Sequence, residues 1–268
     1  METSVGLVHV FVILHMMGCF AFVLMVFSAL AFPKVKRHPI WYNFCLAWVV
    51  FSLSYALLSF GGQQFSTPSR SLCITQAALV YAAPFLSGCA SLALVGQLLF
   101  KILSALSYVT APQTYTIYNV AAIGFPWIAW ISTLLGIILH VRNDDSRVAL
   151  SPNATFCVVL RSPIPRLTAV SSVVFSVAML CLEGAIICML YRNRAIKDIL
   201  NQSNAMAFRV TIYTGAAVIA TGYIAASTFK IQERTIDILL LRYRAATAFA
   251  ATNQRGAVFD VIVALSTC

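Results

Sequence analysis

The sequence contains little charge. Only 10% of its 268 residues are charged and 60% are apolar, whereas about one quarter of the residues in a typical soluble domain are charged. This composition excludes an ordinary soluble domain and indicates a protein built for lipid. The net charge of +10 comes from short basic runs between apolar segments. In that position lysine and arginine set membrane topology and meet anionic lipid or a cytoplasmic partner, so we expect no nucleic-acid binding.

Motifs for catalysis and metal binding are also missing. The sequence has no HExxH, no GxSxG and no paired aspartates within an apolar segment, which argues against an intramembrane hydrolase or another enzyme. The eight cysteines follow no metal-binding or redox spacing, so we expect neither a metal nor another cofactor. No lysine or arginine precedes the first apolar stretch. A secretory signal needs such a basic region, so we interpret the first segment as a retained helix.

Long apolar segments dominate the sequence. About 20 mainly apolar residues cross roughly 30 Å of hydrocarbon as a helix. A seventh candidate, 237–252, is weaker because Arg242 and Arg244 lie near its middle, each costing about 2.5 to 3.5 kcal/mol on an insertion scale. We therefore predict an all-α membrane protein, a single bundle of seven transmembrane helices, or six if the last segment does not span. The six clear segments are 6–32, 40–60, 73–100, 118–141, 167–191 and 210–229.

The basic loops predict the orientation. Basic residues crowd the first loop and follow the fifth helix, and the positive-inside rule assigns both regions to the cytoplasm. The amino terminus is then extracellular and the expected location is the plasma membrane. The same bases form the predicted surface for a cytoplasmic partner: Lys34, Lys36, Arg37, Arg192, Arg194 and Lys197.

The connection between the fourth and fifth helices falls on the extracellular side in this topology. It contains Asn153-Ala154-Thr155, an acceptor pattern for N-glycosylation. A second pattern begins at Asn201 and lies on the opposite side, so only one of the two can be used. The bases of the first loop favour Asn153.

Two cysteines are predicted to face the oxidising compartment. Cys73 stands at the outer end of the third helix, and Cys157 lies in the outer loop between the fourth and fifth helices. A disulfide between them would hold this loop over the mouth of the bundle. The alternative is two unpaired thiols.

Glu183 is the only acidic residue within the first six spans. An intramembrane carboxylate is costly and usually faces the bundle interior or a water-filled cavity. At 1.5 Å per residue it lies roughly 12 Å from the inner end of its helix, and Arg242 lies within about one turn of that depth. A pair between Glu183 and Arg242 would let the seventh segment tolerate its charge. The alternative is that this segment never enters the bilayer.

Polar and aromatic residues in the middle or outer parts of the helices are candidates for a ligand cavity. For each of them, ordinary packing between helices is the competing interpretation. These candidates are Gln76, Tyr81, Trp130, Ser171, Ser172 and Tyr223.

Three short stretches resemble fungal seven-helix proteins that are similar to G-protein-coupled receptors, a group of mostly orphan sequences. Residues 36–44 (KRHPIWYNF) resemble the start of helix two in that group, residues 72–78 (LCITQAA) its entry to helix three, and residues 249–255 (FAATNQR) the end of helix seven. The resemblance implies a seven-helix receptor fold with an outer ligand site and an inner face for a heterotrimeric G protein.

The sequence therefore favours an orphan receptor-like membrane protein. It would bind an extracellular ligand and signal to a cytoplasmic partner. One alternative is a small-solute or proton-coupled transporter with Glu183 as its cation or proton site. Another is a truncated, nonfunctional receptor relic.

Overall fold

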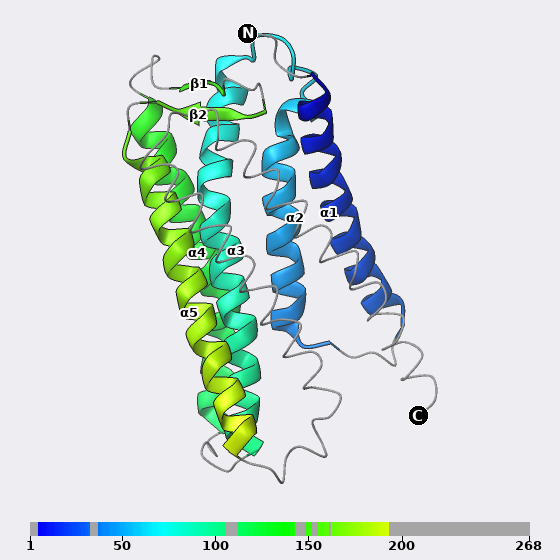
Figure 1. The fold of residues 1–268 in the computed structure, drawn as a ribbon, viewed down its shortest axis with the longest axis vertical. Helices are drawn as coiled ribbons and strands as arrows, with labels where there is room; N and C mark the ends of the chain where they lie inside the picture. The colour runs from blue at the N-terminus through cyan, green and yellow to red at the C-terminus, as the bar shows by residue number, and fades with distance from the viewer. Residues whose placement is uncertain are drawn as a thin grey trace.

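The computed structural model describes residues 5–32, 37–105, 112–142, 148–151, 155–160 and 162–192. Within these ranges the chain forms long helices and one small sheet (Figure 1). The helices are α1 (Val5–Ala31), α2 (Pro39–Phe60), α3 (Arg70–Ala105), α4 (Pro112–Arg142) and α5 (Ile164–Arg192). The strands are β1 (Val148–Leu150) and β2 (Cys157–Val159).

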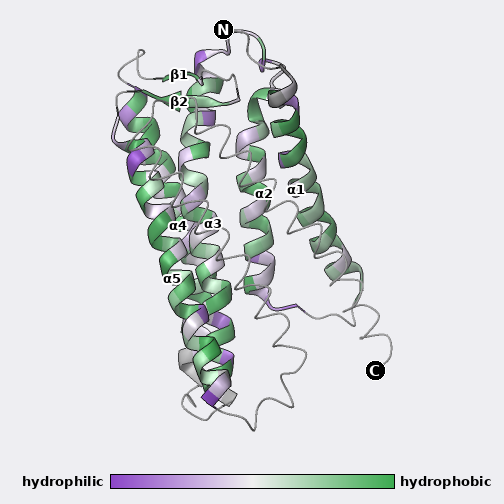
Figure 2. Cartoon of the chain, viewed as in Figure 1, coloured by the Kyte–Doolittle hydropathy of each residue, from purple (hydrophilic) through white to green (hydrophobic). Residues whose placement is uncertain are grey.

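All five helices are long and apolar enough to cross a membrane. Lipid offers no hydrogen bonds to the backbone, so an apolar segment must pair every amide within itself, and a helix does this. Hydrophobic residues extend along most of each helix (Figure 2). The predicted helical fold is therefore confirmed for the described residues, and the length and apolar composition of these helices fit a multi-pass membrane protein. The predicted spans 210–229 and 237–252 lie outside them.

Helices α2 to α5 extend beyond the predicted spans, and α1 starts and ends one residue before its predicted span. The largest difference is in α3, which covers Arg70–Ala105 where the apolar pattern predicted 73–100. A hydrophobicity criterion stops where polar residues begin, but a helix continues into the polar interface because its backbone hydrogen bonds do not depend on side-chain polarity. The description as all-α was also wrong in one respect. The connection from α4 to α5 contains the antiparallel pair β1 and β2.

Helix α3 is at the centre of the described bundle. It packs against α2, α4 and α5, and α1 packs against α2. Small side chains on α3 are almost completely buried, and small residues let helix backbones approach closely in lipid. Ala77, Ala78, Ala82, Ala83 and Ala90 are at most 1% exposed.

Two glycines of α3 lie against aromatic side chains of neighbouring helices. A methyl group at Gly88 would lie 2.6 Å from the ring of Phe175 on α5, and one at Gly96 would lie 2.7 Å from Oη of Tyr118 on α4. The Tyr118 hydroxyl donates a hydrogen bond to the carbonyl of Ala93 at 3.0 Å. Glycine at these positions therefore sets the spacing of α3 from both partners.

Candidate functional site

The two strands lie across one end of the helical bundle, which we call the hairpin end (Figure 1). Helix α1 begins at this end, and β1 and β2 both contact α3. The strands pair with Val148 opposite Val159, Ala149 opposite Val158 and Leu150 opposite Cys157. Their side chains join a hydrophobic cluster with the ends of α2, α3 and α4. The hairpin is thus a packed part of the fold.

A disulfide joins Cys73 to Cys157. It connects the first turns of α3 to the first residue of β2, with a sequence separation of 84 and 5.4 Å between the Cα atoms. Cys73 and Cys157 are both buried within the cluster at the hairpin end. This covalent bond fixes the hairpin on α3.

Gln76 provides a second attachment, one helical turn after Cys73. Its Oε1 accepts a hydrogen bond from the backbone N–H of Cys157 at 3.0 Å, and its Nε2 donates to the carbonyl of Tyr55 on α2 at 3.2 Å. The side chain is fully buried. Gln76 was a ligand candidate in the sequence, but both ends of its amide bind backbone groups of the protein.

Gln64 attaches the other side of the hairpin. It follows α2, and its Nε2 donates to the carbonyl of Thr155 at 3.1 Å. Its Oε1 accepts a hydrogen bond from the hydroxyl of Ser59 at 2.9 Å. Two buried glutamines, from different segments, therefore hold the backbone on either side of Phe156.

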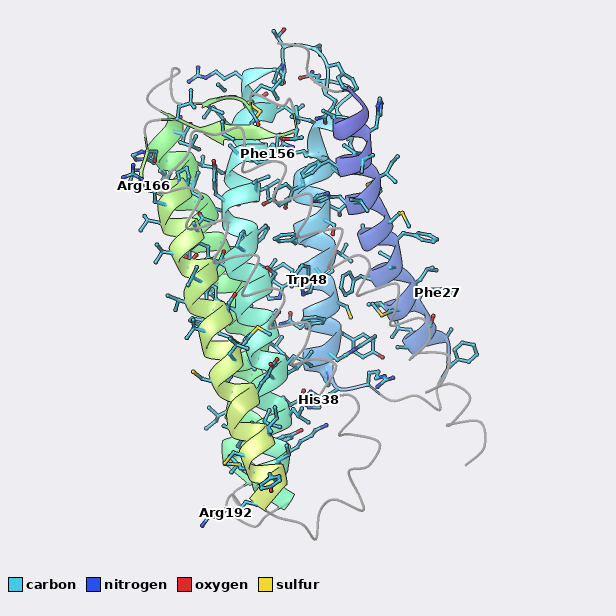
Figure 3. All side chains as sticks on the ribbon, in the orientation of Figure 1. Phe27, His38, Trp48, Phe156, Arg166 and Arg192 are labelled. Carbon is cyan, nitrogen blue, oxygen red and sulfur yellow. A yellow bond between two sulfur atoms is a disulfide. The ribbon has the colours of Figure 1, made fainter. Side chains whose placement is uncertain are left out.

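Phe156 fills the mouth of the bundle between α1, α2 and α3. Its side chain is 5% exposed and packs in a cluster with Phe11, Tyr55 and Val80. The ring centroid of Phe156 lies 5.5 Å from that of Tyr55 and 6.3 Å from that of Phe11. Figure 3 shows Phe156 pointing from the hairpin toward these helices. The sequence analysis did not select Phe156, because an aromatic residue in a loop carries no signal for the helices that it contacts.

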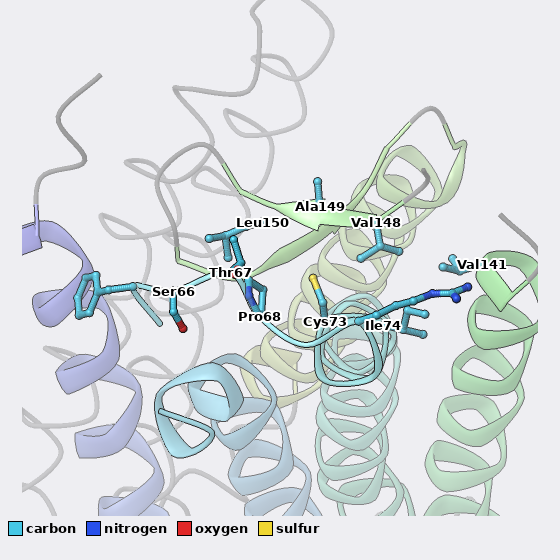
Figure 4. Close-up of a pocket in the computed structure, with 11 residues that line it drawn as sticks. Ser66, Thr67, Pro68, Cys73, Ile74, Val141, Val148, Ala149 and Leu150 are labelled. Carbon is cyan, nitrogen blue, oxygen red and sulfur yellow. The ribbon is translucent and has the colours of Figure 1, made fainter. Parts of the chain in front are cut away.

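A cavity of about 610 Å³ lies beside the hairpin (Figure 4). This volume falls within the range of small-ligand pockets, about 300 to 1,000 Å³. The segment after α2, the start of α3, the end of α4 and strand β1 form its walls. The lining residues are Phe65, Ser66, Thr67, Pro68, Arg70, Cys73, Ile74, Val141, Val148, Ala149 and Leu150.

None of the ligand candidates that the structure describes lines this cavity. Tyr81 packs against the hairpin-end cluster and Trp130 against the α2–α3–α4 core. Ser171 and Ser172 both donate to the carbonyl of Thr168 within α5. Tyr223 lies outside the described residues. Of the lining residues the sequence analysis selected only Cys73, as a disulfide partner. The others lie at the ends of helices, in β1 or in the segment after α2, where no motif marked them.

Glu183 is buried in α5, with 4% of its surface exposed. It is the only carboxylate within the described ranges. Its neighbour one turn away, Ile186, packs with Val95 and Ile102 of α3, so this face of α5 points into the bundle. Arg242 lies outside the described residues.

The opposite end of the bundle carries basic and aromatic groups. Arg37 lies 5.6 Å from the ring centroid of Trp41, and Arg192 ends α5. Figure 3 shows His38 and Arg192 at the end opposite Phe156. The other predicted cytoplasmic bases, Lys34, Lys36, Arg194 and Lys197, lie outside the described residues, as does Asn153.

His38 links α2 to α4 at this end. Its Nδ1 accepts the N–H of Ile40 at 3.3 Å and so caps α2. Its Nε2 lies 3.0 Å from the hydroxyl of Tyr115. Desolvation lowers the pKa of His38, and the nearby charge of Lys101 lowers it further, because both disfavour the imidazolium form.

Within the described ranges, no three His, Cys, Asp or Glu side chains lie close enough together to hold a metal ion. No model of a known protein family matches the chain. No curated protein matches it either.

Proposed function

We propose that this protein is a receptor-like membrane protein that binds a ligand at its hairpin end and signals through the opposite end. The observation that carries the proposal is the hairpin anchored by the Cys73–Cys157 disulfide, with a cavity of about 610 Å³ beside it. A covalently held cap with an adjoining cavity presents a stable recognition surface. The resemblance to fungal seven-helix receptor-like proteins supports the same proposal.

The hairpin end is extracellular in this proposal. Disulfides persist in oxidising compartments, and the bases at the opposite end favour the cytoplasm by the positive-inside rule. Asn153 belongs to the sequence between β1 and β2 and is then a glycosylation site. A mass shift that disappears in Asn153→Gln would support this orientation. A shift that disappears only in Asn201→Gln would show the opposite one.

Signalling would proceed by a shift between two arrangements of the helices. A ligand moves such an equilibrium only by the difference between its affinities for the two states. The seven-helix count is part of the proposal, with 210–229 and 237–252 as the remaining spans. The cytoplasmic partner, a heterotrimeric G protein, would contact the face that contains Arg37 and Arg192.

The test uses cells that carry a G-protein-driven reporter and express the chain. Fractionated culture medium from fungal cells is the stimulus, and labelled amino acids and sugars are offered to the same cells to measure uptake. If the protein is a receptor, the cells should give a reporter response. The double variant Arg37→Glu, Arg192→Glu should reduce this response without loss of surface expression. Uptake without a reporter response would contradict it.

The burial of Glu183 favours a second candidate, a proton-coupled or small-solute transporter. An intramembrane carboxylate that faces a bundle interior is a common proton or cation site. This candidate predicts uptake that depends on a proton gradient and is lost in Glu183→Gln. If the protein is a receptor, cells that express it should take up no more label than cells without it, with or without this substitution.

A further inference from the structure

Strand β1 has one edge that does not pair with β2. Residues opposite each other in an antiparallel pair alternate between hydrogen-bonded and non-hydrogen-bonded positions. The N–H of Ser151 donates to the carbonyl of Phe156 at 2.8 Å, so this pair is hydrogen-bonded. Two residues earlier, Ala149 is therefore also bonded to β2. It follows that the N–H and C=O groups of Val148 and Leu150 point away from β2.

The outer edge of β2 supports this assignment. Cys157 is opposite Leu150 and its N–H must also point out of the hairpin. The structure agrees, because this N–H donates to Oε1 of Gln76 on α3. Helix α3 thus satisfies the outer edge of β2. Within the described residues no backbone group pairs with the corresponding edge of β1.

The cavity lies along this free edge. All three residues of β1 and none of β2 line it. Side chains in a strand alternate between two faces, so a cavity that contacts three consecutive residues borders the edge of the strand. Residues 65–68, which are neither helix nor strand, also line the cavity, and Figure 4 shows Thr67 and Pro68 next to Leu150 of β1. The cavity is therefore a groove bordered by the edge of a strand and by a stretch of irregular backbone.

We propose that this groove binds an extended peptide segment, which adds a third strand to the hairpin along β1. Strand addition uses backbone hydrogen bonds for affinity and side-chain pockets for selectivity. Val148 and Leu150 would provide the backbone partners, and Ile74 and Val141 an apolar floor. Among the lining residues that the structure describes, Arg70 is the only ionisable side chain outside a disulfide, which favours a neutral or acidic peptide. This inference rests on the proposed receptor function for its biological role and names the class of ligand.

The length of the groove defines the probe. Three strand residues span roughly 10 Å at about 3.3 Å each, so a few peptide residues occupy the edge. The probe is a displayed library of linear heptapeptides, selected against the purified full chain in lipid nanodiscs with the disulfide intact. Binding at the groove is defined as binding that Ser66→Trp removes and Phe60→Trp retains. Ser66 lines the groove, whereas Phe60 is exposed at the end of α2 outside it.

Two matched measurements identify strand addition. Leu150→Pro removes the outward N–H but leaves the hydrogen bonds between β1 and β2, because proline is tolerated at the free edge of a strand. Leu150→Ala removes the same side chain and keeps the N–H. We expect Leu150→Pro to bind the selected peptides about fivefold to tenfold more weakly than Leu150→Ala, the usual effect of one hydrogen bond. We also expect N-methylation of the peptide amides to weaken binding at every second position.

Equal affinities for the two Leu150 variants, together with no alternation in the N-methyl scan, would overturn the inference and indicate a side-chain pocket. A selection that yields no peptide with groove-dependent binding would also overturn it. The proposed receptor function can be contradicted independently of the groove. Peptides that bind with the expected alternation but never change the G-protein reporter would support the groove and contradict the signalling role.

Discussion

The backbone N–H of Cys157 donates a hydrogen bond to Oε1 of Gln76 at 3.0 Å, one turn along α3 from the disulfide partner Cys73. A single strand residue is therefore held to α3 both covalently and by a buried hydrogen bond. The attachment satisfies the outer edge of β2, whereas no described backbone group pairs with the outer edge of β1.

Loss of the disulfide should destabilise the hairpin end. A closed loop of this length, 84 residues, corresponds to roughly 4 to 5 kcal/mol in the chain-entropy model, and helices retained in the membrane reduce this value. We expect Cys73→Ser to lower the thermal midpoint measured in nanodiscs. Cys181→Ser is the control, because Cys181 is a free, exposed thiol on α5. Mass spectrometry of non-reduced peptides should recover Cys73 linked to Cys157. Alkylation of both without reduction would contradict the bond.

Gln76→Leu should be destabilising because it leaves the buried N–H of Cys157 without its acceptor and removes a second hydrogen bond from the carbonyl of Tyr55, which lies within α2. A buried donor without a partner costs about 1 to 3 kcal/mol. Gln97→Leu is a matched control on the same helix. Gln97 is also buried, but its Nε2 has no hydrogen-bond partner among the described residues, so its replacement should leave the thermal midpoint unchanged or raise it. A similar loss in both variants would show that the Gln76 hydrogen bonds contribute little.

Gly96→Ala should force α3 away from α4. The added methyl would lie 2.7 Å from Oη of Tyr118, and overpacking of this kind costs about 1 to 3 kcal/mol. Tyr118→Phe removes that oxygen and should recover part of the loss in the double variant. Gly124→Ala provides the comparison, since a methyl there meets no atom within 4 Å. Additive losses in the double variant would exclude this contact as the cause.

The stability of the α2 start should depend on pH. His38 caps α2 as a neutral ring, and its pKa is lowered by desolvation and by Lys101. Its contribution should therefore be complete above the ordinary pKa of 6.5 and be lost as the pH falls through the lower folded value. His38→Asn keeps a capping side chain but does not titrate. Thermal midpoints measured across acidic pH should fall more steeply for the native chain. Parallel curves would refute the prediction.

A seventh span should depend on a pair between Glu183 and Arg242. An unpaired arginine at mid-depth costs about 2.5 to 3.5 kcal/mol, so Glu183→Arg should lower surface expression. Combination with Arg242→Glu should restore part of it. Simple additivity, or a tag after Cys268 found outside the cell, would favour the six-helix topology.

The apolar segments alone predicted the helical class, because about 20 apolar residues in lipid have no other way to pair their backbone. The hairpin was not predicted, because strands of three residues show no periodicity that distinguishes them from a loop. The ligand candidates were chosen by polarity and depth in a helix. That criterion does not separate a side chain open to a cavity from one bound within the fold, as Gln76 is.

The sequence by itself determined the helical class and the five described helices among the seven spans that it predicts, because length and hydrophobicity are local properties. It predicted the Cys73–Cys157 disulfide only through an expected topology, with two unpaired thiols as the alternative. Only the tertiary structure decided which edge of the hairpin is satisfied. Gln76 and Cys157 meet across 81 positions of sequence, and their bond exists only after α3 and β2 have packed. The outward edge of β1 follows from the register of the hairpin, and no backbone group in the described part of the chain pairs with it.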